Sequence, residues 1–192
     1  MVTDKSTAPA LIGIQDKPLL WQAGAVVAGT LFLAAASYVE VPLVPVPVTM
    51  QTLAVTLIGA VYGWRLGALT VIAWLMEAAL GMPVLSGGAA GAHHFVGPTA
   101  GYLFAFPLAA ALTGWLAERG WNGNRPALAF LSMLSGNAIC LALGGLWLAL
   151  AIGLEDAFTF GVLPFLVGGL LKSALGAALL YVLARRQAAK RS

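Results

Sequence analysis

The chain of 192 residues is 60% hydrophobic and only 9% charged, with a net charge of +3. A soluble domain averages about a quarter charged residues and at most about half apolar ones, so this composition excludes a soluble globular domain. The long, continuous apolar runs favour membrane-spanning helices over a β-barrel, because barrel strands alternate apolar and polar residues over about ten positions. We therefore predict an all-α integral membrane protein.

Six apolar stretches qualify, or nearly qualify, as membrane spans, since a helix needs roughly 20 residues to cross the hydrocarbon core. They are residues 19–38, 48–62, 66–80, 98–117, 126–152 and 161–184. The second and third are short, but reading them as one span would bury Arg65 in lipid, which is costly. A tight helical hairpin with Arg65 at the membrane interface is the better interpretation.

The predicted organisation has three parts. Residues 1–18 form a cytoplasmic N-terminal segment, residues 19–184 a six-helix transmembrane domain, and residues 185–192 a basic cytoplasmic tail. The first apolar stretch lacks a small-residue cleavage site followed by a soluble domain, so we interpret it as a retained helix and not as a removed signal peptide.

The distribution of charge predicts which side each loop faces. With six crossings and both termini in the cytoplasm, nine of the ten lysines and arginines lie in cytoplasmic segments, whereas Glu40, Glu155 and Asp156 lie in outer loops. This bias follows the positive-inside rule. The net positive charge is explained by topology and does not indicate nucleic-acid binding; contact of the basic tail with anionic membrane lipid is the alternative role for that segment.

Two outer stretches are not helical in pattern. Residues 40–51 contain three prolines within six positions, which predicts a stiff extended connector. Residues 81–91 are rich in glycine and apolar residues, and His93 and His94 follow them. Apolar outer loops are better explained by folding back over a pocket, where irregular backbone is tolerated, than by ordinary exposed turns.

Lys172 is the one basic residue within a predicted span. A lysine at the centre of a membrane helix costs about 2.5–3.5 kcal/mol even on a lenient scale. Gly168 and Gly176 lie one turn before and after it on the same face, which leaves space for a bound anion. An ion pair with an acidic residue on a neighbouring helix is the alternative.

Three other kinds of residue are candidates for ligand contact. Glu77 is the only acid in a predicted span and could pair with Lys172, bind a ligand or relay protons. Asn137 offers two donors and an acceptor, suited either to a ligand amide or urea or to a bond between helices. Trp74, Tyr102 and Trp147 are candidates for pocket walls, although aromatic residues near helix ends also anchor a protein at the interface.

Other chemistry finds little support in the sequence. The adjacent His93 and His94 lack the i, i+4 spacing of a helical metal pair, and there is neither a nucleophile elbow nor a phosphate-binding loop. Cys140 is interpreted as a small buried side chain. We expect no catalytic residue, no metal and no cofactor, so any drive from ATP must come from another protein.

At these residues the sequence resembles the BioY family, the biotin-specific substrate-binding (S) components of energy-coupling-factor (ECF) transporters. The resemblance runs from about residue 38 to residue 180. Its most specific stretches are VPVPVTMQT at 44–52, LGMPVLSGG at 80–88 and GPTAGY at 97–102, with Gly136-Asn137 and LPFLVGGLLK at 163–172.

The resemblance implies an S-component fold with six transmembrane helices, an outward-facing biotin pocket capped by the first loop, and partners in the form of a transmembrane coupling (T) component and two ABC-type ATPases. It places Lys172 near the ligand and adds Thr49, Gln51 and Gly87 to the expected substrate-binding residues. One departure stands out: the family typically has aspartate three residues before that lysine, where this chain has Gly169. An acidic contact is then missing or supplied elsewhere, for example by Glu77.

The function predicted from the sequence is therefore biotin binding and uptake across the bacterial cytoplasmic membrane, without enzymatic activity. Biotin would enter from outside and contact Lys172, Asn137 and Glu77, with the proline-rich loop closing over it. The rival hypotheses are a membrane-embedded proton-coupled carrier or enzyme that uses Glu77 and Lys172, and an assembly protein without a ligand.

Overall fold

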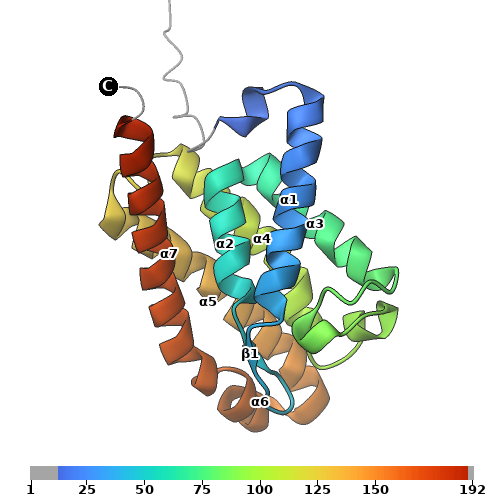
Figure 1. Ribbon diagram of the computed structural model, residues 1–192. Helices are drawn as coiled ribbons and strands as arrows, with labels where there is room; N and C mark the ends of the chain where they lie inside the picture. The colour runs from blue at the N-terminus through green and yellow to red at the C-terminus, as the bar shows by residue number, and fades with distance from the viewer. Residues whose placement is uncertain (1–12, 190–192) are drawn as a thin grey trace, which may run out of the picture.

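A computed structural model describes residues 13–189, in which helices dominate (Figure 1). The long helices are α1 (Leu19–Ser37), α2 (Gln51–Tyr62), α3 (Trp64–Ala79), α4 (Ala100–Glu118), α5 (Pro126–Ile152) and α7 (Leu163–Ala189). Each coincides with one of the six apolar stretches within a few residues. The parts of the N-terminal segment and basic tail that contain Lys5, Lys190 and Arg191 lie outside the described residues.

Within residues 13–189, four helical stretches are long and apolar enough to cross a membrane by length and composition: α1, α4, α5, and residues 154–189 taken together. The 12-residue α2 is a shorter apolar helix, and α3 has 16 residues. Large apolar side chains also cover the outside of the bundle; Leu20 is 83% exposed and Leu150 is 86% exposed. An apolar exterior suits lipid, because water would not wet it favourably.

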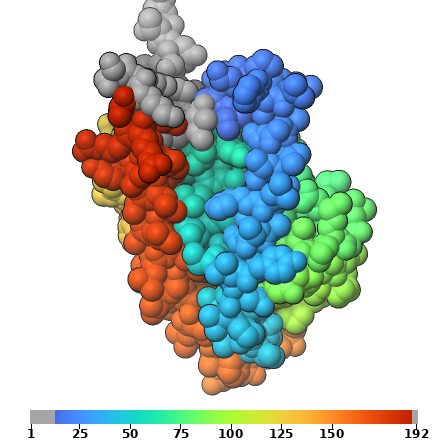
Figure 2. Space-filling view, in the orientation of Figure 1, coloured from blue at the N-terminus to red at the C-terminus, as the bar shows by residue number. Residues whose placement is uncertain are grey.

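The centre of the bundle is formed by α4 and α5, which pack against each other and against most of the other helices. Small side chains allow this close approach, and Gly136 lies against Thr56 and Thr113 where three helices meet. The helix α1 lies at the periphery, and its buried face consists of Gly29, Thr30, Leu33 and Ser37. Figure 2 shows α1 on the outside, with α2 visible between α1 and α7.

Two elements differ from the sequence-based prediction. Residues 40–49 are extended, as predicted, but they also pair as an antiparallel hairpin between β1 (Glu40–Val41) and β2 (Val48–Thr49). Residues 154–160, predicted as outer loop, belong to the short helix α6 (Leu154–Gly161). Gly153, with φ of 88°, separates α5 from α6, and α5 ends at Ile152, as predicted.

The two ends of the bundle differ in their connections. The start of α1, the α2–α3 turn and the end of α7 lie at one end in Figure 1, whereas the hairpin and α6 lie at the other. Arg65 is exposed at the α2–α3 turn and lies 5.0 Å from the centre of the Trp64 ring. Short 3₁₀ helices at Ser86–Gly88 and Ala92–Phe95 connect α3 to α4.

Candidate functional site

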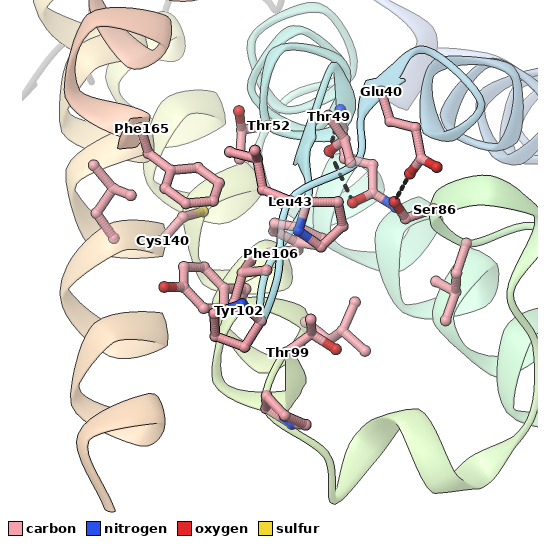
Figure 3. Close-up of a pocket in the computed structure, with 18 of the residues that line it drawn as sticks. Glu40, Leu43, Thr49, Thr52, Ser86, Thr99, Tyr102, Phe106, Cys140 and Phe165 are labelled. Carbon is pink, nitrogen blue, oxygen red and sulfur yellow. Dashed lines mark hydrogen bonds between the residues drawn. The ribbon is translucent and has the colours of Figure 1, made fainter. Parts of the chain in front are cut away.

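A cavity of about 430 Å³ lies at the hairpin end of the bundle. Its walls come from the hairpin, the first turn of α2, the loop before α4, and the facing sides of α4, α5 and α7. Figure 3 shows Thr49, Glu40 and Ser86 on one side of the cavity and Cys140 and Phe165 on the other. Most small-ligand sites have volumes of roughly 300–1,000 Å³ and a few fixed polar groups, and this cavity fits that description.

Lys172 brings a positive charge to the α7 wall of the cavity. Its side chain is half-buried, and the ammonium Nζ donates a hydrogen bond to Thr52 Oγ1 over 3.2 Å. Gly169, one turn earlier, lines the same wall, and a methyl group added there would lie 3.9 Å from Asn137 Cβ. The Lys172 ammonium therefore bonds to a neutral hydroxyl, and Gly169 leaves open space beside the lysine side chain.

Asn137 joins two helices and also faces the cavity. Its Nδ2 donates to the Met133 carbonyl over 3.0 Å and to Ser173 Oγ, on α7, over 3.2 Å. These bonds occupy both amide protons, so the carbonyl oxygen is the group that Asn137 can offer to a ligand. The two interpretations of Asn137 are thus compatible in the same side chain.

Thr49 and Gln51 form the polar wall next to the hairpin. Thr49 Oγ1 donates to Gln51 Oε1 over 3.0 Å, and Gln51 Nε2 donates to Ser37 Oγ, on α1, over 3.0 Å. All three side chains are buried. The amide of Gln51 is consequently held from two sides.

Glu40, Ser86 and His94 lie at the rim of the cavity, and the sequence did not identify them as ligand contacts. Ser86 Oγ donates a hydrogen bond to Glu40 Oε2, which ties the hairpin to the loop before α4 (Figure 3). Gly87 was expected to contact the substrate, but it is exposed and lies outside the cavity lining; a methyl group added there would lie 2.8 Å from Glu40 Oε1. His94 also lines the cavity. Its pKa is lowered from the ordinary value of 6.5, mainly by burial and to a smaller extent by the nearby charge of His93.

Of the three aromatic candidates, Tyr102 lines the cavity, whereas Trp74 and Trp147 lie outside its lining. Tyr102 lines it, donates its hydroxyl to the Gly161 carbonyl over 2.7 Å, and stacks on Phe165. Trp74 is fully buried and stacks on Phe106, a lining residue. Trp147 donates its indole N–H to the Gly97 carbonyl and is not part of the lining.

Glu77 is not brought beside Lys172. It lies on α3, which packs mainly against α1, α2 and α4, and it is not among the residues that line the cavity. The predicted pairing of Glu77 with Lys172 finds no counterpart among the described contacts. Glu40 is the carboxylate that the structure places at the cavity, and its position directly before the proline-rich stretch is the signal that could have identified it.

The fold and the site define a class: a helical membrane protein that encloses a small-ligand cavity with one cationic wall. A family profile described as the BioY family matches residues 14–189. The chain belongs to the BioY family. This confirms the resemblance inferred from the stretches around Thr49, Gly87, Tyr102 and Lys172.

Known relatives carry transporter names. A probable biotin transporter of Pyrococcus horikoshii is 37% identical over 75% of this chain and 86% of its own length. The biotin transporter of Rhodobacter capsulatus is 43% identical over 69% of this chain and 77% of its own. These names agree with the prediction that the chain is a transport protein and not an enzyme.

A solved structure shares the fold. The S-component for biotin from an ECF-type ABC transporter superposes with a TM-score of 0.79, at 24% sequence identity, over 86% of this chain and 92% of that one. The prediction of an ECF S-component-like helical fold is therefore confirmed.

Proposed function

We propose that this chain binds biotin in the cavity and acts as the substrate-specific component of an ECF transporter. The observation that carries the proposal is the ammonium of Lys172 on the cavity wall, bonded to the neutral hydroxyl of Thr52. Biotin offers a carboxylate and a ureido group, and charge-assisted hydrogen bonds are the stronger kind. The acceptor of Asn137 and the amide of Gln51 suit the remaining polar groups.

We further propose six membrane crossings with both termini in the cytoplasm, formed by α1 to α5 and α7. In support, Lys17, Arg65, Arg119 and Arg125 belong to the end of the bundle away from the cavity, whereas Glu155 and Asp156 belong to α6 at the cavity end. By the positive-inside rule the cavity then faces outward across the cytoplasmic membrane.

The proposed partners are a T component and two ABC-type ATPases. The chain contains no phosphate-binding loop of the Walker type, so ATP-driven uptake requires a separate motor. The fold likeness to the S-component of an ECF-type ABC transporter supports the same assembly. The rival of a proton carrier built on Glu77 and Lys172 has no comparable support, because Glu77 is outside the cavity lining.

Biotin titration of the purified chain in lipid nanodiscs tests the proposal. We expect saturable binding to the unaltered chain and a loss of about 10- to 100-fold in affinity for Lys172→Met, because a hydrogen bond to a charged group contributes about 1.5–3 kcal/mol. Lys17→Met, at the opposite end of the bundle, is the matched control and should bind normally. An unaltered chain that does not bind micromolar biotin would sink the proposed function.

A further inference from the structure

Ser37 lies at the C-terminal end of α1 and is completely buried, with 0% of its surface exposed. It does not line the cavity. Its hydroxyl donates to the Leu33 carbonyl over 2.8 Å and accepts the Nε2 proton of Gln51 over 3.0 Å. Since its single proton is used within α1, Ser37 can act toward Gln51 only as an acceptor.

Thr49 restrains the other half of the same amide. Its Oγ1 accepts the backbone N–H of Gln51 over 3.2 Å, and its hydroxyl proton is then directed to Gln51 Oε1 over 3.0 Å. Ser37 thus requires an N–H on its side, whereas the Thr49 hydroxyl donates to Oε1 here but has a second lone pair with which it can accept an N–H. Turning the Gln51 amide by half a rotation would therefore break the bond to Ser37, which is the residue that fixes the orientation.

The consequence concerns what the cavity presents to a ligand. A carboxamide has two N–H donors and two acceptor positions. After the bonds with Ser37 and Thr49, one donor and one acceptor position of Gln51 remain among the bonds made within residues 13–189. Their order along the wall is fixed by Ser37, which lies outside the cavity lining.

We propose that Ser37 is a positioning residue for ligand specificity: it fixes the Gln51 amide so that the cavity distinguishes a hydrogen-bond acceptor from a donor on the bound molecule. The inference rests on the proposed binding of biotin and adds α1 to the elements that determine selectivity. Without the Ser37 hydroxyl the amide can turn and offer its oxygen where it otherwise offers its N–H.

The test compares biotin with 2-iminobiotin, in which a nitrogen that carries hydrogen replaces the ureido oxygen. In Ser37→Ala we expect biotin affinity to fall about fivefold, the effect of one ordinary buried hydrogen bond. The ratio of biotin affinity to 2-iminobiotin affinity should fall as well. In a Gln51→Ala background, Ser37→Ala should change neither quantity.

Thr30→Val is the matched control, because Thr30 is also buried on α1 and its hydroxyl bonds only within the helix, to the Val27 carbonyl. It should leave the affinity ratio unchanged. If Ser37→Ala keeps the ratio of the unaltered chain, or lowers affinity equally with and without Gln51, the inference is overturned while biotin binding stands. If the unaltered chain binds no biotin, the proposed function fails, and this inference fails with it.

Discussion

The two ends of the bundle differ in the length of their connections and in how tightly they are packed. At the end away from the cavity, α2 and α3 meet at Gly63 without an intervening loop, and the Glu118 carboxylate accepts hydrogen bonds from Gln15 Nε2 and the Trp64 backbone N–H. At the cavity end, residues 38–50 and 80–99 form long connections, and their polar groups face an open space.

Because the two ends differ in packing, we expect stability and ligand binding to depend on different ends of the bundle. We call the end away from the cavity the closed end; a methyl group added there at Gly63 or Gly114 would overlap neighbouring atoms, so the packing at this end is tight. The cavity end leaves volume unfilled, and among the described residues a single side-chain hydrogen bond, between Ser86 and Glu40, joins the hairpin to the loop before α4 there. Substitutions at the closed end should therefore change stability first, and substitutions at the cavity end should change binding first.

The largest expected effect is at Gly114, on α4. A methyl group added there would lie 2.5 Å from the Trp64 backbone nitrogen, so the α2–α3 turn would have to shift. Overpacking of this kind costs about 1–3 kcal/mol. We expect Gly114→Ala to lower the midpoint of thermal unfolding in nanodiscs by several degrees, as measured by intrinsic fluorescence.

Gly24 offers the matched control, because a methyl group added there meets nothing within 4 Å. Gly24→Ala should unfold at the same temperature as the unaltered chain or slightly higher, since alanine favours a helix. Equal unfolding midpoints for the two variants would contradict the idea that the closed end limits stability.

A smaller effect, on binding and not on stability, is expected at the cavity rim. Ser86→Ala removes the hydrogen bond to Glu40 that joins the hairpin to the loop before α4. We expect biotin to dissociate about two- to fivefold faster, since one modest hydrogen bond holds these segments together, while the unfolding midpoint stays unchanged. Dissociation of labelled biotin into an excess of unlabelled biotin measures the rate.

Ser135→Ala is the corresponding control, because the Ser135 hydroxyl bonds to the Ser132 carbonyl within α5. It should release biotin at the normal rate. Equal dissociation rates for Ser86→Ala and Ser135→Ala would contradict a role for the hydrogen bond between Ser86 and Glu40 in retaining biotin.

The smallest expected effect depends on pH. Burial and His93 lower the pKa of His94 in the folded state, so below pH about 6.5 the unfolded chain binds more protons than the folded chain. Stability should accordingly decline slightly as the pH falls from about 7 through the lowered pKa. His94→Gln should weaken this decline; an identical pH profile would show that His94 does not contribute.

The helices could be predicted from sequence because hydropathy and charge act over whole segments. The end of α5 at residue 152 was predicted in this way, but the helix α6 and the pairing of β1 with β2 were not. The pairing depends on contacts between Glu40 and Thr49, on opposite arms of the hairpin.

From the residues alone, the site could be predicted only where a residue was unusual for its surroundings; Thr49 and Gln51, which also line the cavity, were expected from the family resemblance. Lys172 and Asn137 stand out as polar residues within apolar helices, and both line the cavity. Glu77 stood out equally, but α3 is apolar on most sides, so its sequence does not determine which side faces the cavity. Ser37 carries no such signal, because its role comes from a contact with Gln51 across 14 positions.

The shortness of α2 has a consequence for depth in the membrane. Twelve residues at 1.5 Å each make a helix about 18 Å long, little more than half of a hydrocarbon layer of about 30 Å. In the proposed arrangement, the hairpin and the cavity make up the remaining thickness of this crossing. The room for a ligand thus comes from a helix too short to fill the layer by itself, and Gln51, in its first turn, lies on the cavity wall.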